Sequence, residues 1–147
     1  MQRGVLACLA VFLTWSVLDF IGHGLIFNSM YAALPGVWRP QAEIKIGVIY
    51  AGVFTAVMAF VSIYSLLIGR KSVMSGVQYG FWFGLANGAS LACGGYAVHP
   101  IQAELAIGWF VLVLIEATLG GLIVGLIVVP CPPLNSDLAK YNSDLAK

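Results

Sequence analysis

The sequence predicts an all-α membrane protein that folds as a bundle of four transmembrane helices. Of its 147 residues, 61 % are hydrophobic and 9 % are charged, whereas a soluble domain carries about 25 % charged residues. Four stretches are apolar over more than the roughly 20 residues that a helix needs to cross a bilayer. These long runs lack the alternation of a barrel strand and favour helices, because hydrocarbon leaves each backbone polar group to be paired within its own segment.

The four expected spans are residues 4–27, 46–69, 72–98 and 105–129. The first contains Asp19 and His23 and the last contains Glu116, whereas the middle two contain no charged residue. We therefore expect residues 1–129 to form a single transmembrane domain. Residues 130–147 are expected to form a short cytoplasmic tail.

Basic residues in the short connections predict the orientation, because cytoplasmic loops carry an excess of Lys and Arg. One side has Arg3, Arg70, Lys71, Lys140 and Lys147, and the other has Arg39 and Lys45. Both termini are therefore expected in the cytoplasm, and a bacterial inner membrane fits the small size and short termini. The turn at residues 70–71 predicts that the spans it joins are antiparallel neighbours, and residues 28–45 form the longer connection on the outer side.

Ionisable groups inside the expected spans are the first candidates for a functional site. Each costs about 2.5–3.5 kcal/mol at the centre of a bilayer, so such groups usually face protein and serve a purpose. His23 follows Asp19 by one helical turn, and Asn87 and Glu116 lie near the centres of their spans. We expect the four to converge on a polar track from the membrane centre to the outer surface. The alternative is that Asp19 only bonds His23, and that Glu116 is neutral and bonds Asn87 or a serine.

Glycine at four-residue steps marks one face of the third span, a pattern typical of a glycine zipper. The row consists of Gly76, Gly80, Gly84 and Gly88. Comparable small faces occur on the second span, at Gly47, Ala51, Thr55 and Ala59, and on the fourth, at Gly121 and Gly125. Small residues let helix backbones approach closely in lipid, where apolar burial alone gives little. We expect these faces to pack helices within one bundle or between subunits.

A short internal duplication predicts two tandem helical hairpins related as a parallel repeat. Residues 41–47 and 102–108 are identical at five of seven positions, and a proline precedes each segment. Each segment is expected to open a helix from the outer side, with Glu43 or Glu104 at the positive end of the helix dipole. Alternatively these glutamates and His99 form an outer mouth that leads to the polar track.

The function that these features favour is a small structural or accessory subunit of a homo- or hetero-oligomeric membrane complex, with an internal polar site. Its partners would be the lipid bilayer and other membrane subunits or copies of itself. The net charge of +1 gives no reason to expect a nucleic acid. A proton- or cation-coupled transport element is the alternative, since carboxyl and imidazole groups build proton relays.

Cofactor binding forms a third class, although we expect no cofactor and, in the absence of a catalytic motif, no enzyme. His23 and His99 are the two histidines of the chain, and a pair of histidines can hold a haem. A metal ion held by these histidines with Asp19, Glu43 or Glu104 is the other arrangement that such ligands allow.

Overall fold

The computed structural model describes residues 2–128, and all regular secondary structure in that range is helical. The long helices are α1 (Gln2–Asp19), α3 (Ile46–Leu67), α4 (Val73–Val98) and α5 (Ala103–Ile127). The short elements are the π-helix η1 (Phe20–Ile26), α2 (Asn28–Ala32) and the 3-10 turn η2 (Gln41–Glu43). The prediction of an all-α chain is confirmed for these residues. The expected tail over residues 130–147 and the last residue of the fourth expected span lie outside the described range.

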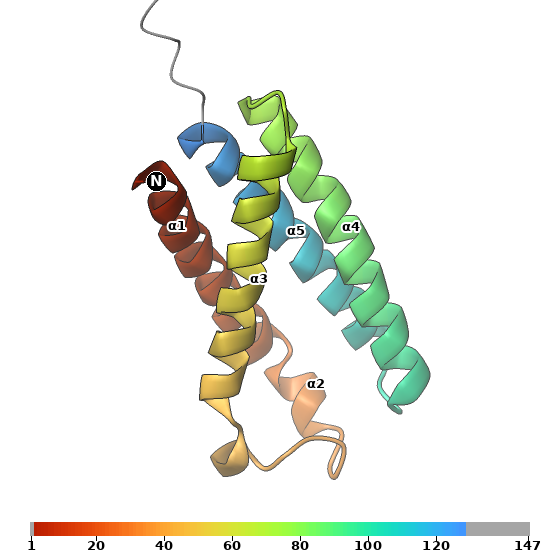
Figure 1. Cartoon of the computed structure of the whole chain (residues 1–147). Coiled ribbons are helices and arrows are strands. Elements are labelled where there is room, and N and C mark those ends of the chain that lie inside the picture. Colours follow the sequence, from red (N-terminus) through yellow and green to blue (C-terminus); the bar gives the residue numbers. More distant parts are fainter. Residues whose placement is uncertain (1, 129–147) are drawn as a thin grey trace, which may run out of the picture.

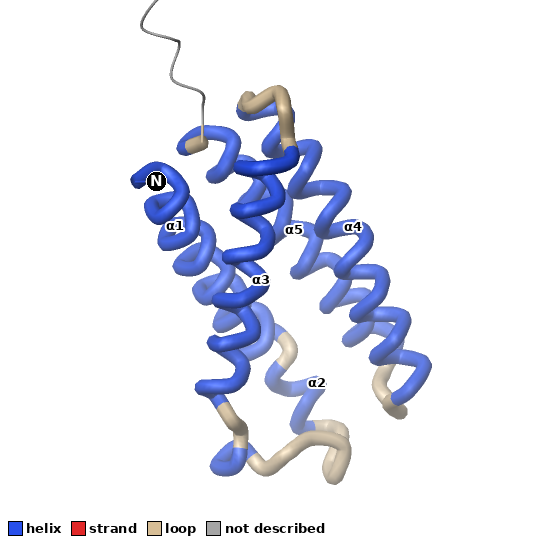
Figure 2. The backbone as a smooth tube through the Cα atoms, in the orientation of Figure 1, coloured by secondary structure: helices blue, strands red, loops and turns tan. Residues whose placement is uncertain are grey.

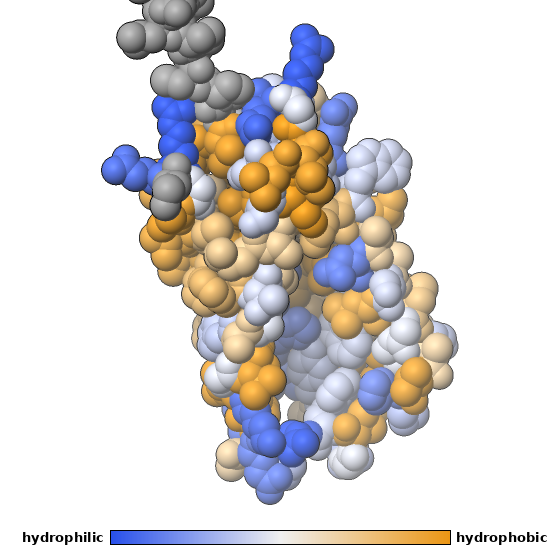
Figure 3. Space-filling view, viewed as in Figure 1, coloured by the Kyte–Doolittle hydropathy of each residue, from blue (hydrophilic) through white to orange (hydrophobic). Residues whose placement is uncertain are grey.

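Three helical segments are long and apolar enough to cross a membrane: Gln2–Ile26, Ile46–Leu67 and Ala103–Ile127. The long helices run up and down, so that the N-terminus, the α3–α4 turn and the end of α5 lie together (Figures 1 and 2). The short helix α2 lies at the opposite end. On the face in Figure 3, strongly hydrophilic residues are concentrated at the two ends, and hydrophobic residues lie between them.

The closest packing in the molecule joins α4 to α5. The four glycines of the α4 row, which we call the glycine face, are buried. A Cβ atom added at Gly80 would lie 2.9 Å from the Gly121 Cα atom, and one added at Gly76 would lie 2.8 Å from that of Gly125. These distances are too short for a side chain, so backbone packs directly on backbone. The glycine face therefore packs inside this chain.

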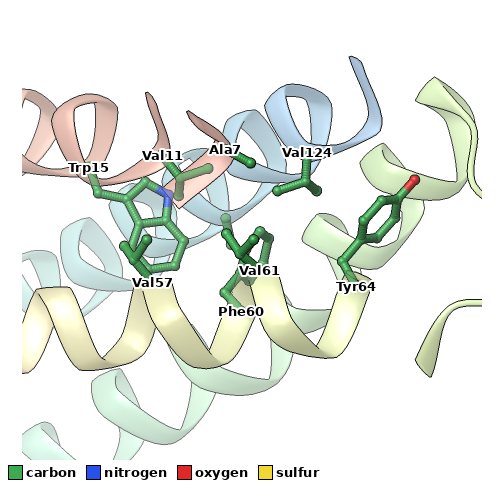
Figure 4. Close-up of a cluster of buried hydrophobic side chains, with 9 residues drawn as sticks. Ala7, Val11, Trp15, Val57, Phe60, Val61, Tyr64 and Val124 are labelled. Carbon is green, nitrogen blue, oxygen red and sulfur yellow. The ribbon is translucent and has the colours of Figure 1, made fainter. Parts of the chain in front are cut away.

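Large side chains hold α1 and α3 against α5. Trp15, Phe60 and Tyr64 lie in a buried cluster with smaller residues of α1 and α5 (Figure 4). The expected contact between α3 and α4 is likewise made by aromatic side chains. The Phe60 and Tyr79 rings are 4.6 Å apart, and the Tyr79 hydroxyl donates to the Phe60 carbonyl oxygen at 2.9 Å. The two helices are connected over residues 68–72, a longer turn than the expected 70–71.

One expectation about the duplicated segments is wrong. The connection over residues 28–45 contains α2 and η2, and Glu43 lies in η2 rather than at the start of α3. Glu104, by contrast, lies in the first turn of α5. The difference has a physical cause, because α5 buries Leu105 and Ala106 against the core at its start. Lys45 occupies the position that matches Ala106, and a lysine cannot be buried there.

Candidate functional site

A cavity of about 210 Å³ lies between the four long helices, near the middle of their length. The residues that line it are Trp15, Asp19, Gly52, Val53, Ala56, Phe83, Asn87, Val113, Glu116 and Ala117. The surface is hollowed between α3 and α4 (Figure 3). The structure thus places Asp19, Asn87 and Glu116, three of the four predicted intramembrane polar residues, around one space. What they do there stays a prediction.

Glu116 is the buried carboxyl group of this cavity, with 7 % of the residue exposed. The indole Nε1–H of Trp15 donates to the Glu116 backbone carbonyl oxygen at 2.7 Å. Gly120 leaves room for this contact, since a Cβ there would lie 2.9 Å from the Trp15 nitrogen. The Oε1 atom of Glu116 has no hydrogen-bond partner among residues 2–128. A buried acceptor of this kind is costly unless a donor reaches it.

Asp19 and Glu116 bring two carboxyl groups to the same cavity, where each acts electrostatically on the other. We call these two residues the carboxyl pair. Two neighbouring carboxyl groups in a largely apolar surrounding do not both ionise, because like charges repel and burial disfavours each charge. We therefore expect the pair to hold one proton and a single negative charge. It couples the end of α1 to the middle of α5.

His23 extends the polar contacts away from the cavity. Its Nε2 atom lies 3.8 Å from Oδ1 of Asp19, and its Nδ1 atom lies 2.5 Å from the hydroxyl oxygen of Tyr31. The histidine belongs to the π-helix η1, in which Gly22 is buried and lies against the Leu112 side chain. Short π-helical segments occur frequently at functional sites. This one carries His23, four residues after Asp19 of the carboxyl pair.

Tyr31 ends the series in α2, at the end of the molecule opposite the N-terminus. The Trp109 indole Nε1–H donates to its hydroxyl oxygen at 2.7 Å, which leaves the Tyr31 hydroxyl hydrogen to be donated to His23. In that arrangement the His23 ring proton is on Nε2 and faces Asp19. Burial, partly opposed by the Trp109 hydrogen bond, raises the pKa of Tyr31 to about 12. The phenol therefore stays a neutral donor at physiological pH.

The other candidates from the sequence lie apart from the cavity. Glu43 in η2, Glu104 in the first turn of α5 and His99 at the end of α4 are all exposed, and none of them lines the cavity. The His99 ring stacks on Trp38, with centroids 6.0 Å apart. The structure does not bring these three to the carboxyl pair.

Two residues of the site were not predicted from the sequence. The indole N–H of Trp15 and the hydroxyl group of Tyr31 each form a hydrogen bond with a residue of α5, which is distant in the sequence. An aromatic residue near a membrane boundary is usually explained by its preference for that boundary, and Tyr31 fits that explanation equally well. The only sequence signal was the pair of glycines, Gly22 and Gly24, which flank His23 and weaken a regular helix there.

The possible cofactor ligands are not gathered at one point in this structure. Within residues 2–128, no group of three or more His, Cys, Asp or Glu side chains could hold a metal ion. The two proposed haem ligands contact different aromatic rings, His23 stacking on Tyr31 and His99 on Trp38.

In comparisons with protein-family models, with curated proteins and with solved structures, this chain shows no match. We therefore infer its function from the geometry of the cavity and of the side chains around it.

Proposed function

We propose that this chain is a proton- or cation-coupled transport element of a membrane. One observation carries the proposal: Glu116, Asp19, His23 and Tyr31 form a polar series that leads from the cavity toward α2. A purely structural role would not require a buried carboxyl group with an unpartnered oxygen. Such groups inside a membrane usually serve ion or proton pathways.

A proton can move along this series when the contact between His23 and Asp19, 3.8 Å in this structure, closes to hydrogen-bond distance. A proton from Tyr31 reaches Nδ1 of His23 as the proton on Nε2 passes to Asp19, so the imidazole ends with its charge unchanged. Asp19 and Glu116 then exchange the proton within the carboxyl pair. A new proton from the outer side restores the Tyr31 hydroxyl. The cavity is the other terminus, where a proton or a cation meets the pair.

The proposed placement in the membrane has four spans, with α4 as the fourth. Its 26 residues reach about 39 Å at 1.5 Å per residue, which exceeds the roughly 30 Å of hydrocarbon in a bilayer. Its many small and polar residues make it less apolar than the other three spans, and packing on α5 covers its glycine face. Both termini would lie in the cytoplasm of a bacterial cell. The tandem arrangement of two hairpins stays a prediction.

Proton flux into liposomes tests the transport proposal. We expect the purified wild-type chain to carry protons when an electrical potential is imposed, and the Glu116→Gln and Asp19→Asn variants to lose most of this flux. Glu104→Gln is the matched control, because it removes an exposed carboxyl group from the same helix. Absence of flux, or equal flux in all four proteins, would contradict the proposal.

A second role, as a subunit of an oligomer, is favoured by one uncovered helix face. Gly47, Ala51, Thr55 and Ala59 of α3 are all exposed in the single chain, and small faces of this kind pair helices in lipid. We expect gently solubilised protein to migrate above monomer mass and Ala51→Leu to shift it toward the monomer. A stable wild-type monomer in mild detergent and in native membranes would count against this role.

A further inference from the structure

We propose that the cavity binds a small organic monocation, an ammonium group attached to an aromatic or branched apolar substituent. This inference rests on the transport proposal, since it names the class of cation that the same site would carry. It is based on three features of the cavity: the Oε1 atom of Glu116 lacks a hydrogen-bond donor, the carboxyl pair is expected to carry a single negative charge, and the walls are mostly apolar.

The charge of the lining favours a monovalent cation. Among the described lining residues, the only ionisable ones are Asp19 and Glu116; α3 and α4 supply none. His23 contacts Asp19 and Tyr31 contacts His23, and neither His23 nor Tyr31 lines the cavity. With one proton shared, the carboxyl pair carries one negative charge, which one ammonium group neutralises. An N–H group of that ammonium supplies the donor that Oε1 of Glu116 lacks.

The size and walls of the cavity favour an organic ion over a bare metal ion. At about 210 Å³, it exceeds the roughly 150 Å³ in which an engineered apolar cavity binds benzene. The walls beside the carboxyl pair are mostly apolar, with Val53, Val113 and Phe83 among them. An inorganic cation needs several oxygen ligands, whereas an ammonium with an apolar body fits both the carboxyl pair and these walls. Aromatic rings also attract organic cations.

Charge neutrality couples this binding to a proton. An apolar surrounding favours states of the cavity without net charge. The carboxyl pair reaches such a state in two ways: with two protons, or with one proton and one bound monocation. Moving between these two states exchanges one proton for one cation. Binding should therefore release about one proton for each cation bound from the doubly protonated pair, and it should weaken as pH falls.

The test uses the full chain in lipid nanodiscs and titration calorimetry with three probes. Benzylammonium is the expected ligand, benzyl alcohol is a neutral compound of similar shape, and Na⁺ is an inorganic cation. We expect saturable binding of benzylammonium only. Repeating the titration in buffers with different heats of ionisation measures the released protons, with about one per cation expected at the low end of the pH range.

Three variants locate the binding at the cavity. Glu116→Gln should weaken benzylammonium by at least about tenfold, the loss expected for one hydrogen bond to a charged group. Glu104→Gln should leave it unchanged. If Glu116→Gln does not fold, Gly52→Leu takes its place: a Cβ at Gly52 meets no atom within 4 Å, so the leucine fills space that the cavity provides and should abolish binding.

Several results would overturn the inference: no benzylammonium binding, equal binding of benzyl alcohol, displacement of benzylammonium by Na⁺, or binding unchanged in Gly52→Leu. Its failure is distinct from failure of the transport proposal. Proton flux that depends on Glu116 without benzylammonium binding would leave transport standing and remove the substrate class. Binding without any flux would leave the site standing and remove transport.

Discussion

The two sides of α5 are packed in opposite ways. Toward α4, glycine meets glycine and backbone contacts backbone at Gly80 and Gly121. Toward α1 and α3, rings such as Trp15 and Phe60 separate the helices, and the cavity lies where these rings do not fill the space. Small residues allow close approach in lipid, whereas large ones set the helices apart. One side of α5 thus fixes how two helices pack, and the other side contains the cavity.

The largest expected difference between the two sides is in the free energy of unfolding when a glycine is replaced by leucine. Gly80→Leu forces a side chain into the α5 backbone, and overpacking of this kind costs about 3 kcal/mol or more. Gly52→Leu enters open space beside the cavity, so the change should stay within about 1 kcal/mol. Unfolding in mixed detergent micelles measures both. Equal losses in the two variants would show that the sides are not packed differently.

Tyr31→Phe tests the packing where α2 meets the side of α5 that faces the cavity. The Tyr31 pKa is raised from 10.0 to about 12, so between these values the unfolded phenol ionises while the folded one must stay neutral. The folding free energy that depends on Tyr31 is therefore complete below pH 10 and falls as pH rises toward 12, by at most about 1.4 kcal/mol per pH unit.

Stability measured against pH checks this expectation. The wild-type chain should lose stability more steeply between pH 10 and 12 than Tyr31→Phe does. Parallel curves would mean that the Tyr31 hydroxyl is not held in the buried contact with His23 and Trp109.

The smallest expected effect concerns the matched segments at the starts of α3 and α5. Glu104 lies in the first turn of α5 and should stabilise it through the helix dipole, so Glu104→Gln should cost about 0.3–1 kcal/mol. Glu43 lies in η2, outside α3, and Glu43→Gln should cost close to nothing. Thermal unfolding at low salt compares the two. An equal cost would indicate that Glu43 does act on α3.

Much of the fold follows from patterns that are local in the sequence. Apolar length places the long helices, and α3 begins at Ile46 and α4 ends at Val98, as the pattern predicts. The four-residue glycine steps define one helix face because the helical period requires it. The match between residues 41–47 and 102–108 misleads, because a single lysine at position 45 prevents the burial that starts α5.

The site depends on contacts that no local pattern encodes. The spacing of Asp19 and His23 suggests their ion pair, but not that η1 is a π-helix or that Tyr31 reaches His23 from α2. Nor does the sequence reveal which face of α1 meets Glu116, since α1 is almost uniformly apolar around its circumference. Sequence reasoning could therefore nominate the carboxyl pair without establishing that its members line one cavity.

The shared proton of the carboxyl pair is the central claim, and infrared spectroscopy tests it most directly. A protonated carboxyl group absorbs at a C=O stretching frequency distinct from that of a carboxylate. We expect a protonated-carboxyl band at neutral pH in wild-type membranes, which disappears in Glu116→Gln and changes frequency in Asp19→Asn, because the buried Glu116 then stays protonated without its carboxyl partner. A spectrum without this band, or a band that neither substitution changes, would contradict the account.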